Sequence, residues 1–280
     1  MTWREWLKRC WMRHSSDDWK STKLSTEADV FDSLEKLHDK RWLFRGQSSH
    51  HSLLPPIDRP PLDKLPRVEK LKRERQSIDL LRETARHFSH PGEEGGLINE
   101  NIALAVLRHY GVPTRLLDWS RSPFVAMFFA VCGQDKEDGE IWSFDERLYA
   151  QNGKEQWRQW PETTIDHSGD DDKFKAEMTE FIREEPPDWF VCMFYPQGFP
   201  RQHAQKGAYS LTARFGRNHA EMIALILQDE SRHHRYVIPA DLKSPLQKAL
   251  RERHGIWRGS LFPDAAGAAE TAKKMAFPEV

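Results

Sequence analysis

The sequence has 280 residues, of which 38% are hydrophobic, and its formal net charge at pH 7 is −1. This length and hydrophobic fraction are sufficient for one large domain with a buried core. Because positive and negative charges nearly cancel, no overall field favours nucleic acid or a membrane as a partner. No window approaches about 18 uninterrupted apolar residues, so we expect no transmembrane segment and no membrane partner.

Other classes of protein are disfavoured by missing motifs. The three cysteines, Cys10, Cys132 and Cys192, are odd in number and lack CxxC spacing, which argues against a disulfide framework and predicts a cytoplasmic protein. The histidines show no HExxH spacing, so we expect no metal site. The patterns GxGxxG after a strand, GxxxxGK[ST] and GxSxG are missing too, which argues against Rossmann, P-loop and serine-hydrolase chemistry.

The N-terminal part of the sequence predicts mainly helices. Apolar residues recur at helical spacing between Trp3 and Trp11, which predicts a helical extension over residues 1–25 that packs on its own domain or docks on a partner. Four helices and one strand are expected after it: a helix capped at Ser25 or Thr26 and ending near Asp39, a strand over Arg41–Gly46, and helices over Val68–His87, over Ile102–His109 and from Ser122-Pro123 onward.

The C-terminal half predicts most of a sheet. A strand is expected over Gly139–Phe144, followed by a polar insertion around residues 145–188 with one or two surface helices. Further strands are predicted over Phe190–Tyr195, Gly207–Ala213, Met222–Gln228 and Tyr236–Ile238, and helices over Lys243–His254 and from Ser260 through Lys274. This order predicts a single α+β domain over residues 26–280, with a small mixed or antiparallel sheet and flanking helices.

Two stretches place charged and hydroxyl side chains against apolar segments, which simple packing does not require. The first is Trp42–Gln47, and the second is Arg108–Pro123, which leads into the apolar run Phe124–Ala130. A third stretch, Arg201–Ser210, places an arginine before alanine, glutamine, glycine and tyrosine at the start of a predicted strand.

These stretches resemble the FRG domain, a family of bacteria and phages named for a Phe-Arg-Gly triplet, which is Phe44-Arg45-Gly46 here. Lys206 departs from the family's usual second glutamine, whereas the closing segment from Gly255 to Asp264 is similar to that family's ending. The resemblance extends from about Thr26 to Lys274. FRG domains occur in mobile elements and antiphage systems and distantly resemble ADP-ribosyltransferases. The resemblance therefore implies an ADP-ribosyltransferase-like split sheet, NAD as substrate, and a role as an intracellular toxin or antiphage effector.

The same resemblance implies the residues that bind NAD. Arg45 would bind its phosphates through the planar guanidinium, and Gly46 would let the dinucleotide approach the backbone. The other expected binding residues are Gln47, His109, Tyr110, Thr114, Arg115, Asp118 and Ser120. Structural alternatives remain for these residues. Arg45 would pair with Asp118, or Asp118 would accept N–H groups of the next helix, which Ser120 or Ser122 would cap. His109 and Tyr110 would form hydrogen bonds only with neighbouring residues.

The catalytic residues implied are Arg45, Gln205 and Glu221. Gln205 falls where the related enzymes carry glutamate or glutamine; it cannot act as a base, but it can hydrogen-bond a ribose hydroxyl. Glu221 is the nearest acidic residue, and the alternative is a solvated carboxylate at a strand edge.

The expected acceptor is a nucleic acid or a protein, and an antitoxin or chaperone would be a further partner. A basic face for nucleic acid, or simply a solvated face, could be formed by Arg201, Lys206, Arg214, Arg217 and the cluster Arg232-His233-His234-Arg235. Two other functions stay open: a non-catalytic module that senses a nucleotide or a phage component, and a metal-dependent nuclease-like effector.

Overall fold

The computed structural model describes residues 19–38, 40–85, 99–158, 191–194, 200–212 and 214–276. The predicted helix near Trp3–Trp11 and most of the predicted insertion lie outside these residues. Within the predicted N-terminal extension, Lys20–Lys23 forms a strand, β1, and the preceding Trp19 is buried in the core.

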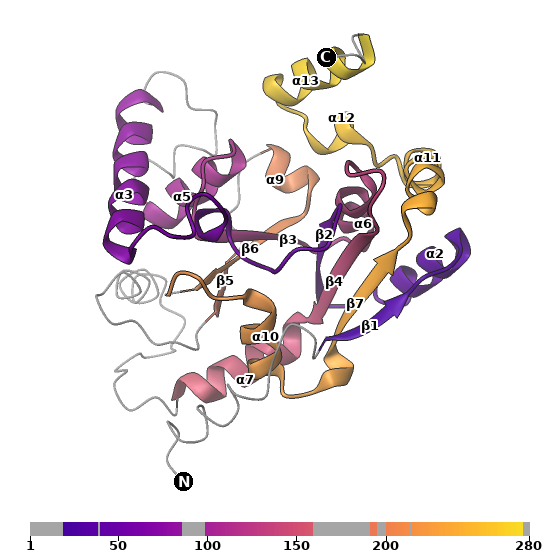
Figure 1. Ribbon diagram of the computed structural model, residues 1–280, viewed down its shortest axis with the longest axis horizontal. Coiled ribbons are helices and arrows are strands. Elements are labelled where there is room, and N and C mark those ends of the chain that lie inside the picture. The colour runs from indigo at the N-terminus through magenta and orange to yellow at the C-terminus, as the bar shows by residue number, and fades with distance from the viewer. Residues whose placement is uncertain are drawn as a thin grey trace.

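A single mixed sheet of seven strands organises the fold, in the order β1-β7-β4-β2-β3-β6-β5 (Figure 1). The strands are β1 (Lys20–Lys23), β2 (Trp42–Gln47), β3 (Leu116–Ser120), β4 (Gly139–Asp145), β5 (Val191–Phe194), β6 (Gly207–Thr212) and β7 (His233–Ile238). β1 runs parallel to β7, and every other neighbouring pair is antiparallel. The prediction of an α+β fold with one mixed sheet and flanking helices is confirmed.

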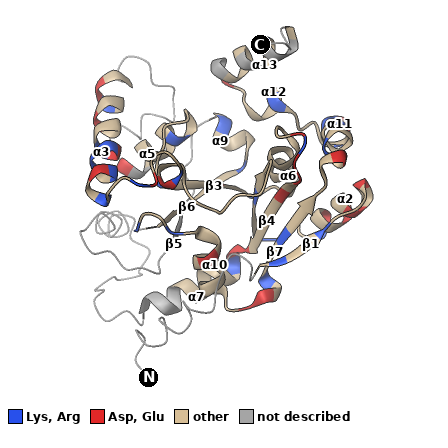
Figure 2. Ribbon diagram, in the orientation of Figure 1, with Lys and Arg blue, Asp and Glu red and all other residues tan. Residues whose placement is uncertain are grey.

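Helices cover both faces of this sheet. They are α2 (Glu27–Glu35), α3 (Arg67–Thr84), α5 (Glu100–His109), α6 (Pro123–Val131), α7 (Glu146–Arg158), α9 (Pro200–Ala204), α10 (His219–Leu227), α11 (Lys243–His254), α12 (Arg258–Leu261) and α13 (Ala265–Ala276). None of these described helices is long and apolar enough to cross a membrane. Both signs of charge occur on α3 and on α11, in line with a net charge near zero (Figure 2).

The core has two parts because successive side chains of a strand point to opposite faces of a sheet. In β2, Leu43 packs in one cluster with α5 and α10, whereas Trp42 and Phe44 pack in the other with α2, α6 and α11. β4 divides in the same way, with Trp142 in the first cluster and Ile141 in the second.

The apolar run after Ser122-Pro123 forms the predicted buried helix. Ser122 Oγ accepts a hydrogen bond from Val125 N at 3.4 Å, and Pro123 occupies the first turn of α6, where a missing N–H costs nothing. The helix lies directly on β2 and β4. A Cβ atom on Gly46 would overlap the backbone carbonyl of Ala126, and one on Gly139 would overlap that of Ala130. Both glycines are therefore required for this close packing.

Two predictions of local structure are wrong. Met222–Gln228 was expected as a strand, but His219–Leu227 is α10, with Asn218 Oδ1 accepting from Ala220 N at 3.0 Å. A short apolar run does not distinguish a strand from a buried helix by periodicity alone. Between α5 and α6, where no strand was predicted, the chain forms β3, which pairs with β2 and β6.

We predict that Gly46→Ala lowers the free energy of unfolding by about 3 kcal/mol, because the added methyl group meets helix backbone rather than a movable side chain. Urea denaturation followed by circular dichroism measures the change. Gly153→Ala in α7 is the control: nothing lies within 4 Å of its added Cβ, so helix propensity should stabilise the protein by up to about 1 kcal/mol. Equal effects of the two substitutions would contradict the packing argument.

Candidate functional site

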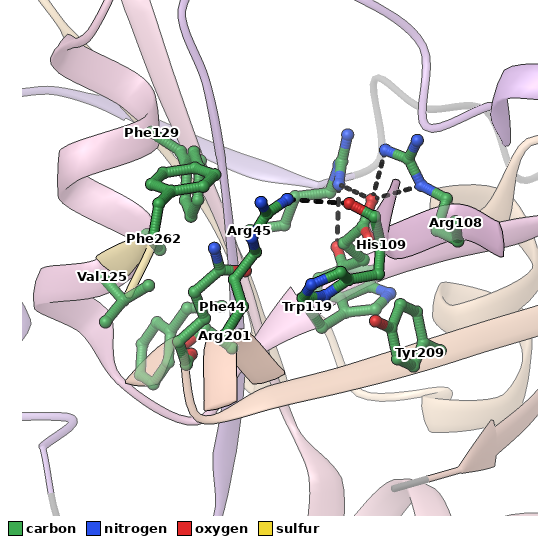
Figure 3. A pocket seen from close by; sticks show the side chains of 15 residues that line it. Phe44, Arg45, Arg108, His109, Trp119, Val125, Phe129, Arg201, Tyr209 and Phe262 are labelled. Carbon is green, nitrogen blue, oxygen red and sulfur yellow. Dashed lines mark hydrogen bonds and ion pairs between the residues drawn. The ribbon is translucent and has the colours of Figure 1, made fainter. Parts of the chain in front are cut away.

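A cavity of about 240 Å³ lies where β2, β3, α5, α6, α9 and the segment after α12 meet (Figure 3). Its lining is cationic and aromatic. The charged and polar residues are Arg45, Arg108, His109, Asp118, Ser120, Arg201 and Gln205, and the aromatic residues are Phe44, Trp119, Phe129, Tyr209 and Phe262. Such a lining suits a ligand that is negatively charged and carries an aromatic ring.

The sheet order brings the sequence stretches together. β2, β3 and β6 are neighbours, Phe44 pairs with Ser120, and Ser120 pairs with Gly207. Arg45, Ser120 and Gln205 therefore reach the same cavity although 160 positions separate the first from the last. The antiparallel pairing of β2 with β3 and of β3 with β6 is what places them side by side.

Asp118 holds two arginines at the cavity. Arg108 donates from Nε and Nη2 to Asp118 Oδ2, at 2.9 and 2.6 Å. Arg45 Nη1 donates to the backbone carbonyl of Asp118 at 2.8 Å and lies 3.7 Å from Oδ2. The expected structural pairing of Arg45 with Asp118 is therefore present, and Arg45 lines the cavity as well.

The protonation states follow from this arrangement. Burial alone would raise the pKa of Asp118, but the charges of Arg108 and Arg45 and the hydrogen bond from Arg108 outweigh it and hold this pKa below its usual value. The pKa of Arg45 falls to about 9, first because of burial and then because of the charges of Arg59 and Arg108. At neutral pH the site therefore contains charged arginines and one ionised carboxylate.

Gln205 is fixed in the wall of the cavity by two hydrogen bonds. Its side-chain Nε2 donates to the backbone carbonyl of Leu261 at 3.1 Å, and its backbone carbonyl accepts from Ser120 Oγ at 2.7 Å. Ser120 Oγ also accepts from Ser122 N at 3.0 Å. In the described part of the chain no donor bonds Gln205 Oε1, so this oxygen can accept a hydrogen bond from a ligand hydroxyl.

Residues 40–139 match the FRG domain. This family model covers β2, α3, α5, β3 and α6, and thus Arg45, Arg108 and Asp118. The comparisons with curated proteins and with solved structures gave no match. The FRG prediction is confirmed over the matched residues, which supply the cavity residues of β2, α5, β3 and α6. Arg201, Gln205, Tyr209 and Phe262 come from the chain beyond the match.

Outside the FRG match, Arg201 joins the last part of the chain to the cavity. Its Nε and Nη2 donate to the two carboxylate oxygens of Asp264, at 2.7 and 2.9 Å, and its Nη1 donates to the carbonyl of His109 at 2.8 Å. The guanidinium carbon also lies 4.8 Å from the ring centre of Phe262. Sequence reasoning assigned Arg201 only to a basic face, although its place at the head of the third motif stretch was a signal of a site role.

Of the predicted binding residues, Arg45, Gly46, His109, Asp118 and Ser120 line the cavity, and so does the predicted catalytic Gln205. The other predicted residues do not line it. Gln47 donates to the carbonyl of His51 at 2.8 Å, and Tyr110 is 48% exposed and packs its ring against His109. Glu221 lies on α10 rather than at a strand edge, with its carboxylate 3.3 Å from Asn218 Nδ2. In the described ranges no group of three His, Cys, Asp or Glu side chains could hold a metal ion.

Thr114 and Arg115 are also buried away from the cavity. Arg115 donates from Nε to Glu74 Oε2 at 2.7 Å and from its backbone N to Oε1 at 2.8 Å. Both side chains are about 5% exposed. This buried pair ties α3 to the start of β3 and leaves Arg115 with a structural role.

We predict that Glu74→Gln destabilises the protein by about 3–5 kcal/mol, because it leaves the Arg115 charge buried without its anion. Thermal or urea unfolding measures the loss. Glu69→Gln on the same helix is the control: Glu69 pairs with Arg73 on the surface, where ion pairs contribute little. A similar loss from both substitutions would show that burial does not set the strength of these pairs.

A buried polar chain lies behind Trp119. Trp119 Nε1 donates to Ser210 Oγ at 2.8 Å, and Ser210 Oγ is also hydrogen-bonded to His219 Nδ1, 2.6 Å away. Burial, and to a lesser degree the charge of Arg45, lower the pKa of His219 to about 3.

His219 therefore makes folding sensitive to acid. The unfolded chain takes up a proton at this side chain as the pH falls below about 6.5, whereas the folded chain does so only near pH 3. We predict that between pH 7.5 and pH 5 wild type loses about 2 kcal/mol more stability than His219→Asn. Urea denaturation at the two pH values measures this, with the exposed His203→Asn as control. An equal pH dependence in wild type and His219→Asn would contradict the lowered pKa of His219 in the folded chain.

Proposed function

We propose that this protein is an NAD-dependent ADP-ribosyltransferase that acts as an intracellular toxin or antiphage effector on a nucleic acid or protein. The single observation that supports this is the meeting of Arg45, Ser120 and Gln205 in one cavity. These residues come from the three sequence stretches that resemble successive motifs of ADP-ribosyltransferases. A toxin of this kind would need a neutralising partner, an antitoxin or a chaperone, in its own cell.

The reaction breaks the bond between nicotinamide nitrogen and ribose C1′, and the bond electrons leave with nicotinamide. A nucleophilic atom of the acceptor then bonds C1′ and loses its proton. In this proposal Arg45 binds the phosphates, and Gln205 Oε1 accepts a hydrogen bond from a ribose hydroxyl. Phe129 and Phe262, with ring centres 6.2 Å apart, offer apolar surface for a ring of the ligand.

A second candidate function is a non-catalytic module that senses a nucleotide. The observation that favours it is the state of the cavity's acidic group: the Asp118 carboxylate is engaged by Arg108 and Arg45 and is held ionised. Gln205 is an amide and cannot act as a base. An acceptor would therefore have to supply a nucleophile that needs little help in losing its proton.

We predict that Arg45→Ala lowers transfer of ADP-ribose by about 100-fold, because NAD loses the group that fixes its phosphates. NAD labelled in the adenylate part is incubated with RNA, DNA or cell extract, and label transfer and nicotinamide release are measured together. Arg147→Ala is the control, since Arg147 is exposed on α7 away from the cavity.

The three candidate functions give different results. Transfer that persists in Arg45→Ala would remove Arg45 from the site. NAD binding without nicotinamide release in any preparation would favour the sensing module. Metal-dependent loss of intact nucleic acid without NAD would identify the nuclease-like effector, our third and weaker alternative.

A further inference from the structure

The charge around Asp118 is unbalanced. Arg45 Nη1 lies 3.7 Å and Arg108 Nη2 lies 2.6 Å from Asp118 Oδ2. The charge of Arg59 also acts here, because it lowers the pKa of Arg45 and its own pKa is lowered by Arg108. Asp118 is the one carboxylate that acts on all three. The group of Arg45, Arg59, Arg108 and Asp118 therefore carries two uncompensated positive charges.

Three other buried ion pairs near the cavity and in the core each join one cation to one anion. Glu74 neutralises Arg115, Asp58 neutralises Lys70 at 2.7 Å, and Asp264 neutralises Arg201. A buried charge is costly unless an anion or a full set of hydrogen-bond acceptors compensates it. Lys243 is buried without an anion but donates to the carbonyls of Ser48, Gly133 and Gln134. Among the described residues, the arginines around Asp118 have neither an anion each nor a full set of acceptors, which points to an anion from outside the chain.

Hydrogen-bond donors remain for such an anion. Arg45 Nε is buried and has no partner among the described residues. Arg108 uses Nε and Nη2 on Asp118, and Arg59 uses Nε on the carbonyl of Leu54 at 2.9 Å. In the described chain this leaves Arg108 Nη1 and both Nη groups of Arg59 without a hydrogen bond. Asp118 and Leu54 thus hold two of the guanidiniums in place while leaving part of each available.

We propose that Arg45, Arg59 and Arg108 form a pyrophosphate subsite at this cavity, with Asp118 as the residue that positions Arg45 and Arg108. A pyrophosphate diester carries one negative charge on each phosphoryl group, which matches the two uncompensated charges. The inference deepens the proposed function and rests on it for the choice of ligand, since a pyrophosphate links the two halves of NAD.

The volume of the cavity fits a ligand whose pyrophosphate lies outside the enclosed part of the site. Its volume of about 240 Å³ lies below the roughly 300–1,000 Å³ of sites that enclose a whole small molecule. Only one half of a dinucleotide would be enclosed. The linking phosphates would then lie at the entrance. Arg59 does not line the cavity, but its segment is tied to the start of β3 by the hydrogen bond from Ile57 N to the carbonyl of Thr114 at 3.3 Å. Its charge also lowers the pKa of Arg45, so it suits the outer phosphate.

Equilibrium binding to the full chain tests the subsite, with ADP-ribose and AMP as probes at one fixed ionic strength. Wild type should bind ADP-ribose at least about tenfold more tightly than AMP, the effect of one further charge-assisted hydrogen bond. Arg59→Gln and Arg108→Gln should each lower ADP-ribose affinity about 10- to 100-fold and bring this ratio close to one. Arg147→Gln is the matched control and should change neither affinity.

Melting temperatures of all variants show which of them are folded, so that a loss of folding is not mistaken for a loss of binding. Arg59→Gln leaves the bonds of Arg45 and Arg108 to Asp118 in place, so it should fold even if Arg108→Gln does not. An ADP-ribose to AMP ratio that stays at the wild-type value in folded Arg59→Gln overturns the subsite. No preference for ADP-ribose in wild type overturns it as well.

The experiments distinguish a failure of the subsite from a failure of the transferase proposal. Binding of ADP-ribose that depends on Arg59, without any nicotinamide release from NAD, supports the subsite and removes the transferase. Cleavage of NAD with wild-type ADP-ribose affinity in folded Arg59→Gln and Arg108→Gln supports the transferase and removes the subsite.

Discussion

The close approach of α6 to β2 and β4 is the constraint on which the rest of the structure depends. Gly46 and Gly139 let the helix backbone lie directly on the two strands, and any larger residue there would push it away. Because Gly46 follows Arg45 in β2, the contact that builds the core also fixes where the guanidinium leaves the sheet. The same helix supplies Val125, Ala126 and Phe129 to the cavity. Fold and site are thus set by one packing contact.

The arginines at the cavity stay in place because each is held by a group that is itself fixed. Asp118 lies in the middle of β3, between β2 and β6, and its backbone and carboxylate both accept from arginines. Arg201 is held in the same manner by Asp264 and by the carbonyl of His109. A binding site with side chains fixed in advance loses little conformational entropy when a charged ligand enters.

Much of this was predictable from local sequence. Ser122 and Pro123 marked the start of α6, Thr26 capped α2, and both helices are present. The Phe-Arg-Gly triplet identified β2 and Arg45, the residue of this strand that reaches the cavity. These features depend on neighbours in the chain, so sequence alone contains the information.

Other features depend on partners far away in the chain. Arg108 and Arg115 lie in one motif stretch, yet Arg108 reaches the cavity while Arg115 is paired with Glu74 on α3. The position of β3 in the sheet determines which of the two arginines reaches the cavity, and local sequence does not show that position. The helical state of Met222–Leu227 was missed because a fully buried helix has no polar face to reveal its period. The roles of Arg201 and Phe262 required knowledge that residues near 260 return to the cavity.

The return of that last segment affects the protein while it is still being made. Phe262 contributes to the cavity and Asp264 holds Arg201, so a nascent chain that has not yet emerged from the ribosome as far as residue 264 has an incomplete site. Every preceding strand of the sheet can already have paired by then. This order of synthesis delays completion of the cavity until residue 264 has left the ribosome.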